Sequence, residues 1–136
     1  MSDAMSNYLE AALINHVLRN TAFTTPGTSI YVGLIQFYES DTLEAGTLTQ
    51  EVSGGSYARQ QHTAWDDPSG VGATENTGTI TFPTATADWG LISGVIISNA
   101  STAGQVLLHG ALTTPRDVVS GDVFKFNDGD LDISFT

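Results

Sequence analysis

From residue 28 to the C-terminus, the sequence consists of short runs rich in Thr, Val, Ile and aromatic residues, separated by Gly, Asp, Asn and Pro. Such runs are typical of β-strands joined by turns. No stretch after residue 28 has a helical period long enough for the crossover helix that connects two parallel strands. The sequence therefore predicts an antiparallel, mainly β fold.

Seven of these runs are predicted to form strands, and an eighth, shorter strand is expected near residues 47–52. The seven cover residues 29–37, 56–65, 77–82, 91–98, 105–112, 122–127 and 131–136. Seven or eight short strands indicate a jelly-roll-like β-sandwich. The remaining long connections, 39–47 and 66–76, are predicted to be exposed loops. The 136 residues match the size of one domain, 1–136, with the sandwich at 28–136.

The first 20 residues follow a different pattern, which predicts one N-terminal α-helix from about residue 7 to 19. The segment NYLEAALINHVLR places Leu and Ile or Val side chains at helical spacing on one face. Asn7 is the predicted N-cap, with Glu10 three residues later as in a capping box. The sequence TTPG at 24–27 ends any helix.

The charge of the chain argues against several classes of partner. The chain has fifteen acidic and four basic residues, which give it a formal net charge of −11. Nucleic-acid binding requires clustered cations, and so does electrostatic binding to an anionic membrane surface. We therefore expect neither nucleic acid nor membrane as a partner. There is no run of 18 apolar residues, no secretory-signal pattern at the start and no cysteine.

The stretch EVSGGSYARQ, residues 51–60, has two interpretations: a phosphate-binding loop or a sharp turn. A phosphate loop opens into a helix, so that backbone amides and the helix dipole face the anion. Here the glycines precede an alternating segment typical of a strand. We therefore expect Gly54 and Gly55 to form a turn with positive φ. Tyr57 and Arg59 would then project from the same face of the strand.

The sequence gives little support for catalysis or metal binding. His16, His62 and His109 do not have the spacing of a zinc site, and no GxSxG motif is present. A Ser-His-Asp triad assembled from distant residues stays open. We expect no enzyme activity, no cofactor and no metal.

The acidic segment NDGDLD, residues 127–132, alternates Asp128, Asp130 and Asp132. These carboxylates are possible Ca²⁺ ligands, but the segment lacks the distal Glu of an EF-hand loop. A tight Asn-Asp-Gly turn between two strands is the favoured interpretation. Trp65 and Trp89 are similarly either core residues or, as the alternative, platforms on which a sugar ring stacks.

Five blocks, in this order, carry a resemblance that spans nearly the whole chain: NYLEAALINHVLRNTAF, YVGL, EVSGGSYARQ, TITFPTATADWG and GALTTPRDVVSGDVFKFNDGDLDISF. Together they resemble a family of small tailed-phage virion proteins, often described as tail-fibre-like. Similar jelly-roll proteins serve as decoration or cement proteins on icosahedral heads. The segment IQFYESDTLEAGTLTQ is longer and more acidic than the corresponding loop of the family.

The resemblance implies a non-enzymatic structural protein of a tailed bacteriophage, made in the host cytoplasm. The favoured interpretation is a capsid decoration or cement protein that binds the major capsid protein on the outer surface of the head as a homotrimer. The alternative is a tail-fibre or baseplate component that contributes to recognition of a host glycan.

The helix is the element most expected to contact a partner, because its apolar face must be buried. It packs either on its own sheet or against a neighbouring subunit. The candidate interface residues are Tyr8, Leu9, Leu13, Val17, Arg19, Tyr57 and Arg59. Because basic residues are so few, Arg19, Arg59 and Arg116 are candidates for specific ion pairs.

Overall fold

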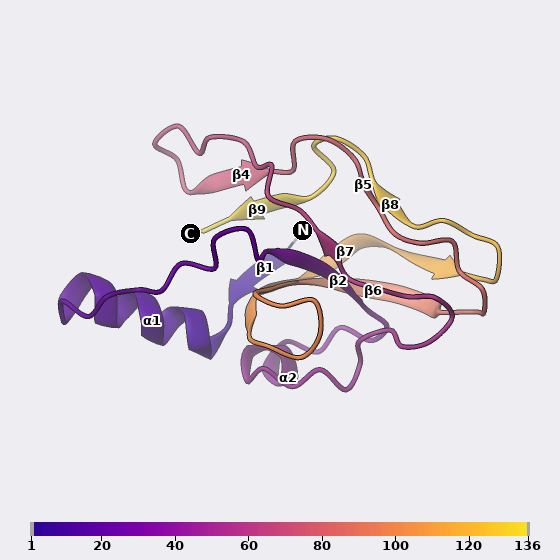
Figure 1. Cartoon of the computed structure of the whole chain (residues 1–136), viewed down its shortest axis with the longest axis horizontal. Helices are drawn as coiled ribbons and strands as arrows, with labels where there is room; N and C mark the ends of the chain where they lie inside the picture. The colour runs from indigo at the N-terminus through magenta and orange to yellow at the C-terminus, as the bar shows by residue number, and fades with distance from the viewer. Residues whose placement is uncertain (1, 136) are drawn as a thin grey trace.

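The computed structural model describes residues 2–135, and in this part the chain is mainly β with antiparallel pairing throughout (Figure 1). Its strands are β1 (Ser2–Met5), β2 (Tyr31–Ile35), β3 (Gln60–Gln61), β4 (Ala73–Glu75), β5 (Ile80–Thr81), β6 (Gly90–Ser98), β7 (Val106–Val118), β8 (Lys125–Phe126) and β9 (Asp132–Ser134). Its helices are α1 (Asn7–Leu18) and α2 (Ser40–Glu44).

The strands form one large sheet and two small ribbons. The five-stranded sheet has the order β1-β7-β6-β2-β3, and the two-stranded ribbons are β4-β9 and β5-β8. In Figure 1 the two ribbons lie on one side of the large sheet and α2 lies on the other. The predicted antiparallel β fold with an N-terminal helix is confirmed and is consistent with a β-sandwich. Its jelly-roll connectivity stays a prediction.

The large sheet has apolar residues packed on both of its faces. On one face, a core that includes Val32, Leu34 and Val95 packs with the aromatic side chains of the β5-β8 ribbon. The rings of Phe82, Phe124 and Phe126 lie edge-to-face there, with centroids 5.2–6.5 Å apart. On the other face, Ile35, Leu43, Ile96 and Val106 form a smaller cluster that α2 covers.

Most predicted strands coincide with observed ones, but the boundaries and three elements differ. The predicted strand at 56–65 pairs at Gln60–Gln61 and at an isolated bridge between Trp65 and Asn76, and the last strand ends at Ser134. Residue 136, which the prediction included, lies outside the described part. The sequence missed β1 and β4, and it missed α2 inside the predicted loop at 39–47. These three elements have five residues or fewer, so their sequence patterns are weak.

The N-cap of α1 is Ser6 rather than the predicted Asn7, and the helix ends at Leu18. The Ser6 hydroxyl accepts a hydrogen bond from the Leu9 amide (3.2 Å) and donates one to the Val106 carbonyl. Ser6 is buried, and its own amide donates to the Leu107 carbonyl. Together with the pairing of β1 on β7, these bonds fix the start of α1 to the edge of the sheet.

The predicted glycine turn is confirmed. Gly54, Gly55 and the following Ser56 all have positive φ, at 76°, 57° and 64°. The Gly55 carbonyl accepts hydrogen bonds from the Thr86 amide and from Nε1 of the buried Trp89. No helix follows the turn. The positive φ of Ser56 keeps this residue out of the predicted strand, because extended strand backbone requires negative φ.

Candidate partner interface

The apolar face of α1 is divided along the length of the helix. Leu9 is buried at 8% exposure and Leu13 is half-buried. Farther along, Ile14, Val17 and Leu18 are 55%, 72% and 77% exposed. In Figure 1 the helix extends away from the sheets. The chain's own sheet therefore covers only the N-terminal part of the helix, and the C-terminal part presents apolar side chains to solvent.

An apolar groove of about 330 Å³ adjoins the inner side of α1. Its walls come from the helix, the segment after it, the sheet and the C-terminal strand: Leu9, Leu13, Phe23, Pro26, Ile30, Trp65, Thr74, Ile97, Leu107, Leu108, Ile133 and Phe135. None of these side chains is charged. Groove and helix end together form a large apolar surface, and such surfaces on soluble proteins mark interaction sites.

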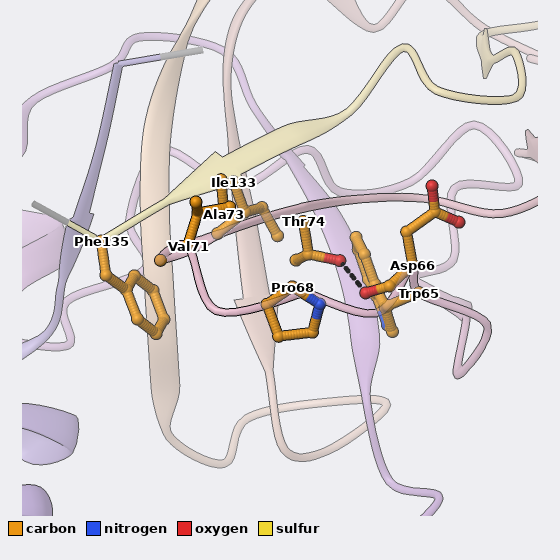
Figure 2. A pocket seen from close by; sticks show the side chains of 9 residues that line it. Trp65, Asp66, Pro68, Val71, Ala73, Thr74, Ile133 and Phe135 are labelled. Atoms are coloured by element: carbon orange, nitrogen blue, oxygen red, sulfur yellow. Dashed lines mark hydrogen bonds between the residues drawn. The ribbon is translucent and has the colours of Figure 1, made fainter.

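A cleft of about 380 Å³ continues the groove between the β4-β9 ribbon and the loop that precedes it (Figure 2). Groove and cleft share Trp65, Thr74, Ile133 and Phe135. Across the cleft, the Thr74 hydroxyl donates a hydrogen bond to the Asp66 carbonyl at 2.6 Å. Of the two candidate sugar-stacking residues, Trp65 lines this cleft. Trp89 is 2% exposed and belongs to the core, so the favoured interpretation is confirmed for this residue and the alternative of a sugar platform is wrong for it.

The far side of the cleft carries an acidic rim made of Asp66, Asp67, Glu75 and Asp132. Burial, together with the neighbouring Asp132, Asp66 and Asp128 carboxylates, raises the pKa of Glu75. Such crowding of like charges favours a nearby cation. The apolar surface is thus bordered by negative charge on the ribbon side.

Arg59 and Tyr57, both predicted as interface residues, belong to a hydrogen-bonded network around Glu51. Arg59 is 7% exposed, and its guanidinium donates to both carboxylate oxygens of Glu51 at 2.7 and 2.8 Å. It also donates to Ser98 Oγ and to the carbonyls of Ala100 and Ala103. The guanidinium is therefore buried and bonded within the fold, and a role of Arg59 toward a partner stays a prediction.

Tyr57 projects to the same side as Arg59, as predicted, and its hydroxyl donates to Glu51 Oε1 at 2.9 Å. The same hydroxyl accepts from the Leu34 amide. Burial, reinforced by the Glu51 charge, raises the pKa of Tyr57. The ring contacts Phe82 and Trp89 in the core. Tyr57 is therefore mainly a core residue, and its role toward a partner stays a prediction.

The remaining predicted interface residues lie on or next to α1. Tyr8 is 42% exposed, and Arg19 is exposed, with its Nη1 donating to Asn15 Oδ1 at 3.1 Å. The structure thus groups Tyr8, Leu9, Leu13, Val17 and Arg19 on one element, and their role toward a partner stays a prediction. Arg116, another candidate for an ion pair, lies over the Phe124 ring at 5.1 Å.

Ile14 and Leu18 belong to the apolar face predicted from the sequence but were not among the candidate interface residues, and the groove was not predicted. One signal was available for this surface. No Asp or Glu occurs between residues 11 and 38, although the whole chain carries 15 acidic residues. This acid-free segment includes most of α1 and the groove wall formed by Phe23, Pro26 and Ile30.

The three histidines lie in three different environments. His16 is exposed on α1, and the His62 ring packs edge-on against Trp65. His109 is fully buried on β7, where its Nδ1 is 2.9 Å from the Tyr38 hydroxyl. Among residues 2–135, no group of three or more His, Cys, Asp or Glu side chains could hold a metal ion.

The Asp-rich segment 127–132 forms the predicted turn. Gly129 has a φ of 78°, and the Asp130 amide donates to the Asn127 carbonyl at 3.0 Å. The Asp128 carboxylate accepts from the Gly78 amide, and the Asp130 carboxylate accepts from the Asn127 amide. These carboxylates therefore stabilise the backbone of the turn.

Among residues 2–135, neither α1 nor α2 has the length and apolar character of a membrane span.

Replacing Arg59 by Met is expected to lower the free energy of unfolding by about 3–5 kcal/mol, because it leaves the Glu51 carboxylate without its cation in a largely buried site. Urea denaturation followed by circular dichroism measures the loss. Arg19→Met is the matched control and should cost less than about 1 kcal/mol, since that residue is exposed. Equal losses in the two variants would contradict the account of Arg59.

Burial lowers the pKa of His109 from its ordinary value of 6.5, although Glu44 on α2 and Glu10 on α1 act in the opposite direction. As the pH falls below about 6.5, the unfolded chain takes up this proton while the folded chain does not. Folding stability should therefore fall by up to about 1.4 kcal/mol per pH unit from this group alone.

Urea denaturation of the wild type and of His109→Gln at pH 7, 6 and 5 measures this dependence. The difference in free energy of unfolding between the two proteins should change with pH in favour of the variant as the pH falls. Thr114→Ser is the control and should remain parallel to the wild type, because that side chain is exposed and carries no titratable group. Parallel curves for His109→Gln would show that the buried ring does not contribute in this way.

Comparison with known proteins identifies the family of the chain. A search of curated proteins gives no match. The model of the family described as podophage GP4 fiber I protein gp80 matches residues 4–134, which is nearly the whole chain. That match covers α1 and every strand from β2 to β9. The chain therefore belongs to this family and is a structural protein of the phage virion.

Proposed function

We propose that this chain is a non-enzymatic subunit of a fibre-type assembly on the virion of a tailed phage. The observation that carries the proposal is the family match over residues 4–134, since the family is described as a fibre protein. The structure supports it through the exposed apolar end of α1 and the adjoining groove. A subunit of an assembly needs such a surface, because association buries apolar area.

The physics of such a role is association rather than chemistry. Each contact between small subunits is modest, but several linked contacts raise the overall affinity by roughly 10² to 10⁴. The sandwich supplies a scaffold with apolar packing on both faces of its main sheet. The negative charge of the chain limits aggregation of free subunits before they meet their site.

Capsid decoration is the second candidate, with the major capsid protein as partner. It is favoured by the compact arrangement of sheets and ribbons in the described residues, which contain no repeated shaft-like element (Figure 1). A decoration protein binds the assembled shell but not its separated subunits, and so stabilises the shell by mass action. In a fibre role that includes host glycan recognition, the cleft beside Trp65 is the surface that fits a sugar ring (Figure 2).

Immunogold labelling of intact virions with an antibody to this chain tests the proposal. A fibre subunit predicts gold on the tail or its appendages, in a small and constant number of positions. Gold spread over the heads in many copies would establish decoration instead. If purified virions carried no label while a known head protein and a known tail protein were both labelled, both candidates would fail.

A further inference from the structure

We propose that copies of this chain assemble head-to-tail, with the exposed end of α1 of one copy seated in the apolar groove of the next. The inference deepens the proposed structural role and rests on it. Two separate features of one chain, an apolar projection and an apolar groove, carry it.

The projection is the C-terminal half of α1. Ile14, Val17 and Leu18 are spaced i, i+3 and i+4, so they lie together on one face of the helix. They are more than half exposed, although they are among the most apolar side chains of the protein. The helix start is fixed to β7 by the Ser6 bonds and by β1, so the projection is held at a defined position.

The groove cannot be filled by the same helix end. Leu9 and Leu13 of α1 already line it, from the other half of the helix. The volume of about 330 Å³ has room for a small number of aliphatic side chains, and its lining includes no charged residue. Val17 and Leu18 from a second copy have the size and chemistry that the groove requires.

The distribution of charge favours a second copy of the chain as the occupant of the groove. Two chains with a net charge of −11 repel each other over most of their surfaces. The helix end lies within the acid-free segment 11–38 and carries Arg19, one of only four basic residues. The groove is bordered on the ribbon side by the acidic rim of Asp66, Asp67, Glu75 and Asp132. Projection and groove are therefore complementary in charge as well as in apolar character.

The contact joins two different patches, so it is heterologous rather than isologous. A heterologous contact makes a closed ring when its rotation closes, and each copy then makes two contacts. A trimer is the ring size that agrees with the homotrimer of the capsid-decoration interpretation, which the resemblance implies. Such a ring removes the exposed apolar helix end of every copy from solvent.

Analytical ultracentrifugation of the full chain tests the contact. The wild type should sediment as a closed oligomer, and Val17→Asp should weaken self-association at least about 100-fold, because it places a charge in an apolar groove. Val123→Asp is the matched control, since Val123 is also exposed, at 49%, in the connection between β7 and β8. Arg19→Glu should weaken association as well.

A mixing experiment tests the head-to-tail arrangement. Val17→Asp destroys the projection, and Phe135→Asp, at a groove residue that is 48% exposed, destroys the groove. Each variant alone should be monomeric, but a mixture should form a species of two chains through the one intact contact. Circular dichroism and urea denaturation verify that both variants are folded.

A wild type that stays monomeric would overturn the inference, and so would a Val17→Asp protein that assembles normally. If the folded variants failed to pair in the mixture, the head-to-tail arrangement would be wrong. None of these outcomes affects the immunogold result, so the structural role on the virion is tested separately.

Discussion

The structure depends on how the apolar face of α1 is covered. β1 pairs with the edge of the main sheet, and the buried Ser6 binds β7 through its side chain and its amide. These bonds hold the start of the helix against the sheet, so Leu9 and Leu13 contact the groove while Val17 and Leu18 extend beyond it. A helix with this placement cannot bury its whole apolar face within its own chain. The uncovered part is the surface that we propose a second copy covers.

A second set of contacts, centred on Arg59, holds together the part of the chain that carries this helix. The buried Arg59 connects the turn at 51–59 to the connection between β6 and β7 through Glu51, Ser98 and the carbonyls of Ala100 and Ala103. Every bond of this guanidinium is made inside the chain. An enclosed cation of this kind holds two irregular segments together, and the bridge of Glu51 to Ile35 fixes the first of them to β2.

The sequence predicted the antiparallel strands and the N-terminal helix because their periodicities of two and 3.6 residues extend over several residues. It could not predict α2 or β4, which are too short to show a period. Arg59 was assigned to a partner because a scarce cation suggests a specific ion pair. The pair exists, but Glu51 lies in the same chain, eight residues earlier. The groove was beyond prediction because its walls come from segments as distant as Leu9 and Phe135.

Cysteine crosslinking shows directly whether the end of α1 of one copy lies in the groove of another copy. The chain has no cysteine, so the double variant Leu18→Cys, Phe135→Cys introduces the only two thiols. The account predicts that mild oxidation gives covalent oligomers up to the size of the closed ring, whereas each single variant gives none or far fewer. Only monomers from the double variant, or dimers formed equally by Leu18→Cys alone, would contradict it.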